Sequence, residues 1–359
     1  MNPVFSDKQL NKVVKAGAFA ACAAIAAASL TGCQSSKAAK VGDKLERKGQ
    51  EIMVAGQLFH VGAPVVLWTD EGGYDAYRVG KRFGDYKKSS WADAKNKWVT
   101  TPNRYNLRYG KIDKESGEVK HWSPEKLDQI RGGGWDLKTL QNTVDQFVYH
   151  YDVCGTSQRC FKVLQDMRGL SVHFMLDIDG TIYQTMDLKE RAWHAGTSND
   201  RSIGIEIANM GAYSPKEIKK TGVFKKWYAT NKDGEKIITV PEEMGDGGVR
   251  TKGFVGKPMG GVAVKGTIQG RELYQYDLTP EQYKSLIKLT AALTEVFPKI
   301  QLDYPRDENG KLIPHILNED MAKTYGGLIG HYHISKRKVD PGPAFNWDYI
   351  IEEAKKLKK

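Results

Sequence analysis

Residues 172–185, Val-His-Phe-Met-Leu-Asp-Ile-Asp-Gly-Thr-Ile-Tyr-Gln-Thr, decide the predicted fold class of this chain of 359 residues. The apolar run 172–178 predicts a strand, Asp179-Gly180 predicts a hairpin turn, and residues 182–185 predict the returning strand. Further strands are expected at 147–150 and 202–208, with a helix at 158–168 between the first strand and the hairpin. Strands interspersed with helices in this way indicate an α/β domain.

A long amphipathic helix is expected to begin after Thr279. This threonine is a suitable N-cap, Pro280 occupies the first helical position, and Glu281 follows it. One face of the helix is expected to lie in the core, because apolar residues recur at helical spacing: Tyr283, Leu286, Ile287, Leu289, Leu293 and Val296.

The chain divides into five predicted segments. Residues 1–32 are expected to be a signal peptide, 33–50 a polar tether, and 51–140 an N-terminal extension packed on the core. Residues 141–350 form the predicted catalytic domain, and 351–359 a basic C-terminal tail. Residues 212–277, rich in Gly and Lys with alternating apolar positions at 261–268, are predicted to be an inserted β-hairpin or loop beside the site.

The residue types best suited to metal binding gather in Gly330-His331-Tyr332-His333-Ile334-Ser335-Lys336-Arg337-Lys338-Val339-Asp340-Pro341-Gly342-Pro343. Neutral imidazole and carboxylate are the ligands that a hydrolytic zinc site favours. One segment seldom closes such a site alone, so a third ligand is expected from His150, at the end of a predicted strand. Glu206, on another predicted strand, offers a carboxylate for proton transfer. Together these residues suggest a zinc hydrolase.

The N-terminus predicts export. Lys8, Lys12 and Lys15 precede the alanine-rich stretch 16–30, which is shorter than the roughly 20 apolar residues of a membrane-spanning helix. Leu30-Thr31-Gly32-Cys33 then resembles a bacterial lipobox, in which Cys33 is lipidated and becomes the mature N-terminus. Because Gln34 and not Asp follows, we expect anchoring at the periplasmic face of the outer membrane. An ordinary signal peptide with a chance cysteine, or an uncleaved anchor, is the alternative.

Two cysteines remain once Cys22 leaves with the signal and Cys33 accepts the lipid. In an exported chain, Cys154 and Cys160 favour a disulfide that closes a short loop. Two free thiols are the alternative, and a zinc site is less favoured because the spacing is not Cys-x-x-Cys.

The net charge of +11 becomes about +9 after residues 1–32 are removed, because three lysines and one aspartate leave with them. A basic chain suits anionic partners such as cell-wall polymer or membrane headgroups. Nucleic acid is not expected as a partner, because no basic helix and no alternation of aromatic and basic residues is present. The sequence also lacks a phosphate-binding glycine loop and a Gly-x-Ser-x-Gly nucleophile motif.

Five motifs in order make the chain resemble the zinc-dependent N-acetylmuramoyl-L-alanine amidases of type 2, relatives of peptidoglycan recognition proteins. They are the strand ending in His150, the hairpin 171–184, Arg191-Ala192-Trp193-His194-Ala195-Gly196, the strand 202–206, and the segment 331–343. The resemblance covers residues 144–347 apart from the insertion. It implies a central mixed β-sheet flanked by helices and one Zn²⁺ per chain.

Carried over by position, the resemblance makes His150, His331 and Asp340 zinc ligands, Glu206 and Lys338 catalytic, and His194 a substrate-pocket residue. Many family members have one more residue between the second histidine and the ligand aspartate. Because His331 and His333 would share a face of an extended strand, a site that uses both is an alternative.

Each of these residues also has a structural interpretation. His150 could be a core histidine, Glu206 a buried carboxylate paired with a cation, Lys338 one charge of a solvated run, and His194 a packing partner of Trp193. The expected activity is cleavage of the amide bond between N-acetylmuramic acid and L-alanine in peptidoglycan or muropeptides. A peptidoglycan-binding protein of the same fold without turnover, or a zinc peptidase acting on the stem peptide, is the alternative.

Overall fold

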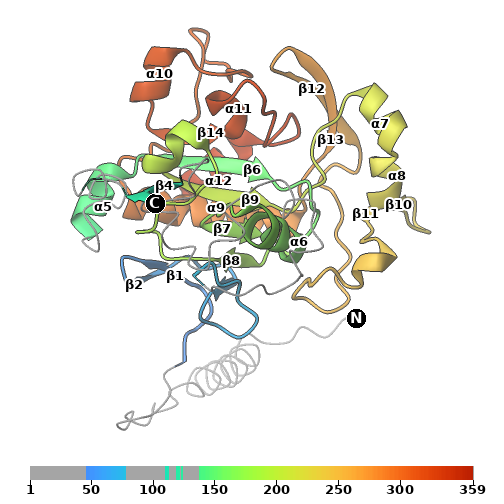
Figure 1. Ribbon diagram of the computed structural model, residues 1–359. Coiled ribbons are helices and arrows are strands. Elements are labelled where there is room, and N and C mark those ends of the chain that lie inside the picture. Colours follow the sequence, from blue (N-terminus) through green and yellow to red (C-terminus); the bar gives the residue numbers. More distant parts are fainter. Residues whose placement is uncertain (1–45, 78–109, 113–118, 122, 124–136, 359) are drawn as a thin grey trace, which may run out of the picture. The chain divides into compact units, whose positions relative to one another are not determined.

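Figure 1 shows the computed structural model, which describes residues 46–77, 110–112, 119–121, 123 and 137–358. The expected signal peptide 1–32, the lipid acceptor Cys33 and most of the tether 33–50 lie outside these residues. Lys48–Lys359 form one unit. Within the described ranges, every helix is too short or too polar to cross a membrane.

The centre of the fold is a six-stranded sheet. The strands lie across it in the order β14 (Gly327–Gly330), β6 (Gln146–Tyr151), β9 (Ser202–Ile207), β7 (Phe174–Leu176), β8 (Ile182–Gln184) and β3 (Val65–Leu67). The pairs β14–β6, β6–β9, β9–β7 and β8–β3 are parallel, whereas the predicted hairpin β7–β8 is antiparallel. The predicted α/β fold with a mixed central sheet is therefore confirmed.

One face of the sheet packs on α9 (Pro280–Val296) and α12 (Trp347–Leu357). The capping prediction for α9 holds, because the Thr279 side chain accepts from Gln282 N–H and the Gln282 side chain accepts from Thr279 N–H. Its predicted apolar face is buried, and each large apolar side chain buried there contributes about 1.5–3 kcal/mol. The sheet contributes alternate residues of each strand to this core: Phe147 and Tyr149, Phe174 and Leu176, and Ile203, Ile205 and Ile207.

The other face of the sheet carries α6 (Ser157–Phe161) and η3 (Lys162–Arg168), which together fill the predicted helix 158–168. The helix begins at Thr156, whose side chain accepts from Arg159 N–H, and ends at Gly169 in a left-handed conformation. Its second half is a π-helix, which the sequence did not indicate. Alternate residues of β6 and β9, His150 and Glu206 among them, lie on this face.

The N-terminal extension is joined to the sheet. β1 (Glu51–Val54) and β2 (Gln57–His60) form a hairpin, and β3 pairs with β8 at the sheet edge. The carboxylate of Asp187 accepts hydrogen bonds of 2.7 Å from Ala55 N–H and Gly56 N–H in the turn of that hairpin. β4 (Gly110–Ile112) pairs with β5 (Val119–His121), and α5 (Leu137–Thr143) leads into β6.

The insertion 212–277 contains more regular structure than the predicted hairpin. That hairpin is present as β12 (Ala263–Ile268) and β13 (Arg271–Tyr276). The unpredicted elements are α7 (Pro215–Thr221), α8 (Val223–Trp227), β10 (Tyr228–Thr230), β11 (Lys236–Ile238) and η5 (Glu242–Met244). Aromatic side chains hold the insertion together, as in the pair Tyr228 and Tyr276, whose ring centroids are 4.1 Å apart.

The C-terminal boundary at residue 350 falls inside α12. Residues 351–357 continue this helix, and Ile351 and Ala354 are buried in the core because they extend its apolar face. The basic segment 351–359, which the sequence indicates as an ordinary helix end, is therefore largely the last two turns of a packed helix.

Candidate metal centre

The topology brings the predicted ligands together at the carboxyl ends of three neighbouring parallel strands. His150 lies near the end of β6 and is the register partner of Glu206 on β9. His331 begins α11 (His331–Ile334), directly after β14, which pairs with β6 on its other side. Parallel sheets bind ligands at this edge, because the strand ends and the following loops meet there.

His150, His331 and Asp340 turn three donor atoms toward one point. Asp340 Oδ2 lies 2.8 Å from His150 Nδ1 and 3.0 Å from His331 Nδ1, and the two nitrogens are 3.0 Å apart. Donors around a tetrahedral zinc ion lie roughly 3.3 Å apart, so these residues fit one ion after an adjustment of a few tenths of an ångström. All three side chains are buried, and they form a group that could hold a metal ion.

The protonation states also suit a divalent ion. Burial is the main reason that the pKa of His150 falls to about 4, and the charge of His331 adds to this effect. Burial would raise the pKa of Asp340, but the adjacent imidazoles hold it far below the ordinary carboxyl range. Neutral imidazole and ionised carboxylate are the metal-binding forms of these side chains.

His333 does not belong to this group. The alternative that used both histidines assumed an extended strand, but residues 331–334 are helical, so the two rings point in different directions. His333 Nε2 donates to the Ile313 carbonyl at 2.8 Å, and its Nδ1 accepts from Gly330 N–H at 2.9 Å. Both ring nitrogens are therefore occupied.

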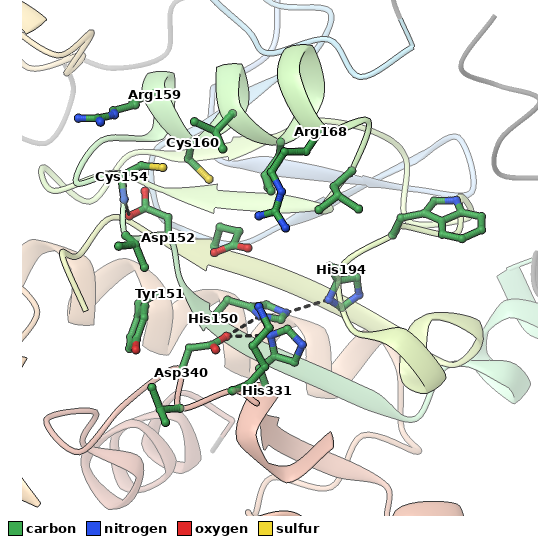
Figure 2. A pocket seen from close by; sticks show the side chains of 18 of the residues that line it. His150, Tyr151, Asp152, Cys154, Arg159, Cys160, Arg168, His194, His331 and Asp340 are labelled. Atoms are coloured by element: carbon green, nitrogen blue, oxygen red, sulfur yellow. Dashed lines mark hydrogen bonds and ion pairs between the residues drawn. The ribbon is translucent and has the colours of Figure 1, made fainter. Parts of the chain in front are cut away.

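His194 contacts the metal group as well as lining the cavity. Its Nδ1 lies 2.9 Å from His150 Nε2, and its Nε2 lies 3.2 Å from Ser202 Oγ. Figure 2 shows His194 on the opposite side of the His150 ring from Asp340. If His150 gives Nδ1 to a metal, its Nε2 carries the proton and donates to His194, which in turn donates to Ser202.

A cavity of about 510 Å³ opens beside these ligands, and Glu206, Lys338 and His194 line it. Oxygen Oε2 of Glu206 is buried and has no hydrogen-bond partner among the described residues. Burial raises the pKa of Glu206 well above the ordinary value, Asp340 and Asp152 raise it further, and Lys338 opposes them. Arg159, Arg168 and Arg337 also line the cavity, and Figure 2 shows the Arg168 guanidinium directed into it.

The expected disulfide is not formed. Cys154 and Cys160 are free, buried thiols in the cavity wall. Burial is also the main cause that raises the pKa of the Cys160 thiol. The loop that was expected to be closed by a bond is instead held by the Asp152 carboxylate, which accepts from Cys154 N–H at 2.8 Å and Gly155 N–H at 3.0 Å.

Asp152, Asn209 and Ser202 were not singled out in the sequence. Asp152 lines the cavity two residues after His150, and burial raises its pKa to about 7 although three backbone N–H groups oppose the shift. Asn209 follows β9, and its N–H donates to Asp152 Oδ1 at 3.2 Å. Polar residues directly after predicted parallel strands were the available signal for Asp152 and Asn209.

One protein family and one curated protein are similar to the chain in sequence. The family model described as N-acetylmuramoyl-L-alanine amidase matches residues 140–343. The curated 1,6-anhydro-N-acetylmuramyl-L-alanine amidase AmpD of Haemophilus influenzae is 24% identical over 225 residues, which are 62% of this chain and 74% of that protein.

Two solved structures are similar to parts of the chain. The amidase AmiD from E. coli, in complex with anhydro-N-acetylmuramic acid-L-Ala-D-gamma-Glu-L-Lys, has 18% identity and a TM-score of 0.32 over 58% of this chain. That match spans 57% of AmiD, a little over half its length. The endolysin amidase LysCS from Clostridium intestinale has 17% identity and a TM-score of 0.30, over 61% of this chain and 88% of its own.

Proposed function

This chain belongs to the N-acetylmuramoyl-L-alanine amidase family, and we propose that it is a zinc-dependent peptidoglycan hydrolase. The bond cleaved is the amide between the lactyl group of N-acetylmuramic acid and L-alanine of the stem peptide. The name of the curated relative, a 1,6-anhydro-N-acetylmuramyl-L-alanine amidase, supports this bond.

The observation that carries the proposal is the convergence of His150, His331 and Asp340 beside the unpartnered carboxylate oxygen of Glu206. Three protein ligands are typical of catalytic zinc, whereas structural zinc sites have four. A zinc ion held there supplies Lewis acidity, which polarises a carbonyl group and acidifies water at neutral pH. A protein that only binds peptidoglycan has no need of this combination.

Glu206 is the proton carrier in the proposed reaction. Hydrolysis forms a bond between a water oxygen and the amide carbon, breaks the carbon–nitrogen bond, and places a proton on the leaving nitrogen. The Glu206 carboxylate accepts the proton from water and then donates it to that nitrogen. Its burial in the cavity wall supports this role, because a raised pKa brings a carboxylate nearer to the working pH.

Lys338 is the proposed electrostatic partner of the carbonyl oxygen. Its side chain lines the cavity next to the metal group, two residues before Asp340. An ammonium group there stabilises negative charge that develops on the oxygen as the water adds. Arg168 and Arg337 add positive charge to the same cavity, which suits an anionic peptide substrate.

The test is digestion of muropeptides by the purified protein, with products identified by mass. Release of the free stem peptide that requires both zinc and Glu206 is the expected result, so digestion stops with a chelator and with Glu206→Gln. Anhydro-muropeptides and muropeptides with a reducing sugar are digested in separate assays, and the faster of the two reactions shows which sugar end the enzyme prefers. Binding without cleavage by the zinc-loaded protein would contradict the hydrolase proposal and favour the peptidoglycan-binding alternative.

We also propose that Cys33 carries the lipid that anchors the protein in the cell envelope. The support is the sequence 30–33 and the short apolar stretch before it. Each buried acyl methylene adds about 0.8 kcal/mol to membrane binding, so two or more chains hold a protein firmly. Labelling with a radioactive fatty acid should mark the wild type, and Cys33→Ser should abolish both the label and the membrane fraction of the protein.

A further inference from the structure

The hairpin of β12 and β13, within the insertion 212–277, contacts the loop that presents the third metal ligand. We propose that this hairpin is a positioning element for the metal centre, acting through Gln275 and Gln269. The proposal rests on the proposed zinc site and assigns the insertion a role in it. Neither glutamine is among the residues that line the cavity, so each acts through the loop and not through substrate.

Gln275 holds the chain directly after Asp340. Its Nε2 donates to the Pro341 carbonyl at 3.0 Å, and its Oε1 accepts from Ala344 N–H at 3.0 Å. The side chain is 1% exposed, so water cannot replace these bonds when they are lost. The two bonds fix both ends of the turn that leads the chain away from Asp340.

The same amide contacts Asn209, and through it the segments that follow β9 and β6. Gln275 Nε2 lies 3.3 Å from Asn209 Oδ1, and Asn209 N–H donates to Asp152 Oδ1. Asn209 follows the strand of Glu206, and Asp152 follows the strand of His150. Gln275 therefore joins the Asp340 loop to the segments that follow the other two functional strands.

Gln269 holds the segment between the second and third ligands. It lies at the hairpin turn with a φ of 54°, and its Nε2 approaches the carbonyls of Tyr332 at 2.8 Å and Ser335 at 3.1 Å. The Lys338 carbonyl is 3.4 Å from the same nitrogen. These carbonyls belong to the turn that connects His331 with Asp340, so Gln269 fixes its outer side.

The turn after Asp340 packs closely against the hairpin. A Cβ at Gly342 would lie 2.1 Å from Gln275 Oε1, and a Cβ at Gly266 of β12 would lie 2.6 Å from Pro343 Cβ. The side chains of Gln275 and Pro343 can lie this close to the backbone at positions 342 and 266 because both positions are glycine. Metal sites lose affinity when such supporting contacts are removed, because the ligands are then free to move out of position.

The experiment compares zinc affinity, measured by competition with a chromophoric chelator, in the wild type and in Gln275→Ala and Gln269→Ala. We expect the zinc dissociation constant to rise 10- to 100-fold in Gln275→Ala and by a smaller factor in Gln269→Ala. The visible spectrum of the Co²⁺-loaded protein should shift as well, because it reports ligand geometry. Glu272→Gln, which removes only a surface pair with Lys265 on the same hairpin, should match the wild type.

A second control separates positioning from general loss of stability. Ile351→Ala removes a buried side chain of α12, which belongs neither to the hairpin nor to the segment 331–344, so it should lower stability while the folded form binds zinc normally. Wild-type affinity in both glutamine variants, or an equal loss of affinity in Ile351→Ala, would overturn the proposal. A wild type that binds zinc without cleaving muropeptides would refute the proposed hydrolase activity and leave the positioning role intact.

Discussion

His150 has a partner at each of its two ring nitrogens, and the outer partner determines which nitrogen is free for a metal. His194→Ala removes the acceptor for His150 Nε2–H, so we expect zinc affinity to fall about 10- to 100-fold. His194→Gln can still accept the hydrogen bond from His150 Nε2–H, so it should retain part of the affinity. Ser202→Ala should have a smaller effect than His194→Ala. Competition with a zinc chelator measures all three, and full affinity in His194→Ala would refute the role assigned to this contact.

Glu206 is expected to contribute to catalysis but not to metal binding. Glu206→Gln keeps the size of the side chain but cannot accept a proton from water, so we expect kcat to fall by about 10²- to 10⁴-fold. Zinc affinity should stay close to the wild-type value, because Glu206 lies outside the group of three ligands. Steady-state kinetics on a defined muropeptide, with zinc content measured on the same sample, tests both statements.

His333 makes the protein sensitive to acid. Burial lowers its folded-state pKa to about 3, whereas an unfolded histidine titrates near 6.5. Between these values the unfolded chain binds the extra proton, so stability falls as the pH drops, by up to about 1.4 kcal/mol per pH unit. Above pH 6.5 the effect is absent.

The variant His333→Gln isolates this contribution, because glutamine can donate to the Ile313 carbonyl and accept from Gly330 N–H but does not titrate. Urea unfolding of the metal-free protein from pH 4 to 7 should give a shallower loss of stability for the variant. Identical slopes for the two proteins would contradict the prediction.

The gathering of His150, His331 and Asp340 could be expected from sequence because the resemblance identifies each of them by position, although the spacing between His331 and Asp340 is one residue shorter than in many family members. The orientation of His333 could not, because it depends on residues 331–334 being helical and on the Ile313 carbonyl, which is distant in the sequence. The contact between His194 and His150 likewise requires two segments that only the folded sheet brings together.

The loop between β6 and α6, residues 152–156, packs against Trp227 of the insertion. A Cβ at Gly155 would lie 2.4 Å from the Trp227 ring, and the residue has a φ of 78°. We therefore expect Gly155→Ala to destabilise the protein by about 1–2 kcal/mol for the left-handed backbone and about 1–3 kcal/mol more for the clash.

Gly234→Ala is the matched control for this prediction. Gly234 has a φ of 81° and nothing within 4 Å of its Cβ position, so its substitution should cost only the backbone contribution. Chemical denaturation measures both free energies of unfolding, and equal values would show that Trp227 can move aside.

Elements with a strong local signal were predicted well. The hairpin β7–β8 and helix α9 each begin or turn at residues whose backbone preferences are clear, and both are present. The π-helical half of the α6–η3 segment was missed, because a π-helix differs from an α-helix only in which carbonyl each N–H reaches. Helix α7 has a capping box of Ser214 and Glu217, a local signal that the sequence reasoning did not use. Helix α8 is only five residues long, and packing of Phe224 and Trp227 stabilises it more than local propensity does.

At the scale of the whole molecule, the family match and the folded unit have different boundaries. The match begins at residue 140, but β3 at Val65–Leu67 covers the edge of the sheet next to β8. A chain that begins at residue 137 should leave the backbone of β8 exposed and aggregate, whereas one that begins at residue 48 should remain monodisperse. Light scattering of the two purified chains tests this, and a monodisperse short chain would show that β3 is dispensable.

The sheet membership of β3 was beyond sequence reasoning. Val65-Val66-Leu67 is a short apolar run that strands and buried loops share, and its partner Ile182-Tyr183-Gln184 lies more than 100 residues further along the chain. Only the general statement that residues 51–140 pack on the core was available, and much of that segment lies outside the described residues.

The pairing of β3 with β8 also sets an order of events during synthesis. β3 is the first strand of the sheet to leave the ribosome, and it has no partner in the sheet until residues 182–184 have followed. Contacts so distant in sequence form late, because a long loop must close before they contribute. Until β8 has been made, β3 therefore stays without its partner in the sheet and is available to proteins that recognise unfolded polypeptide.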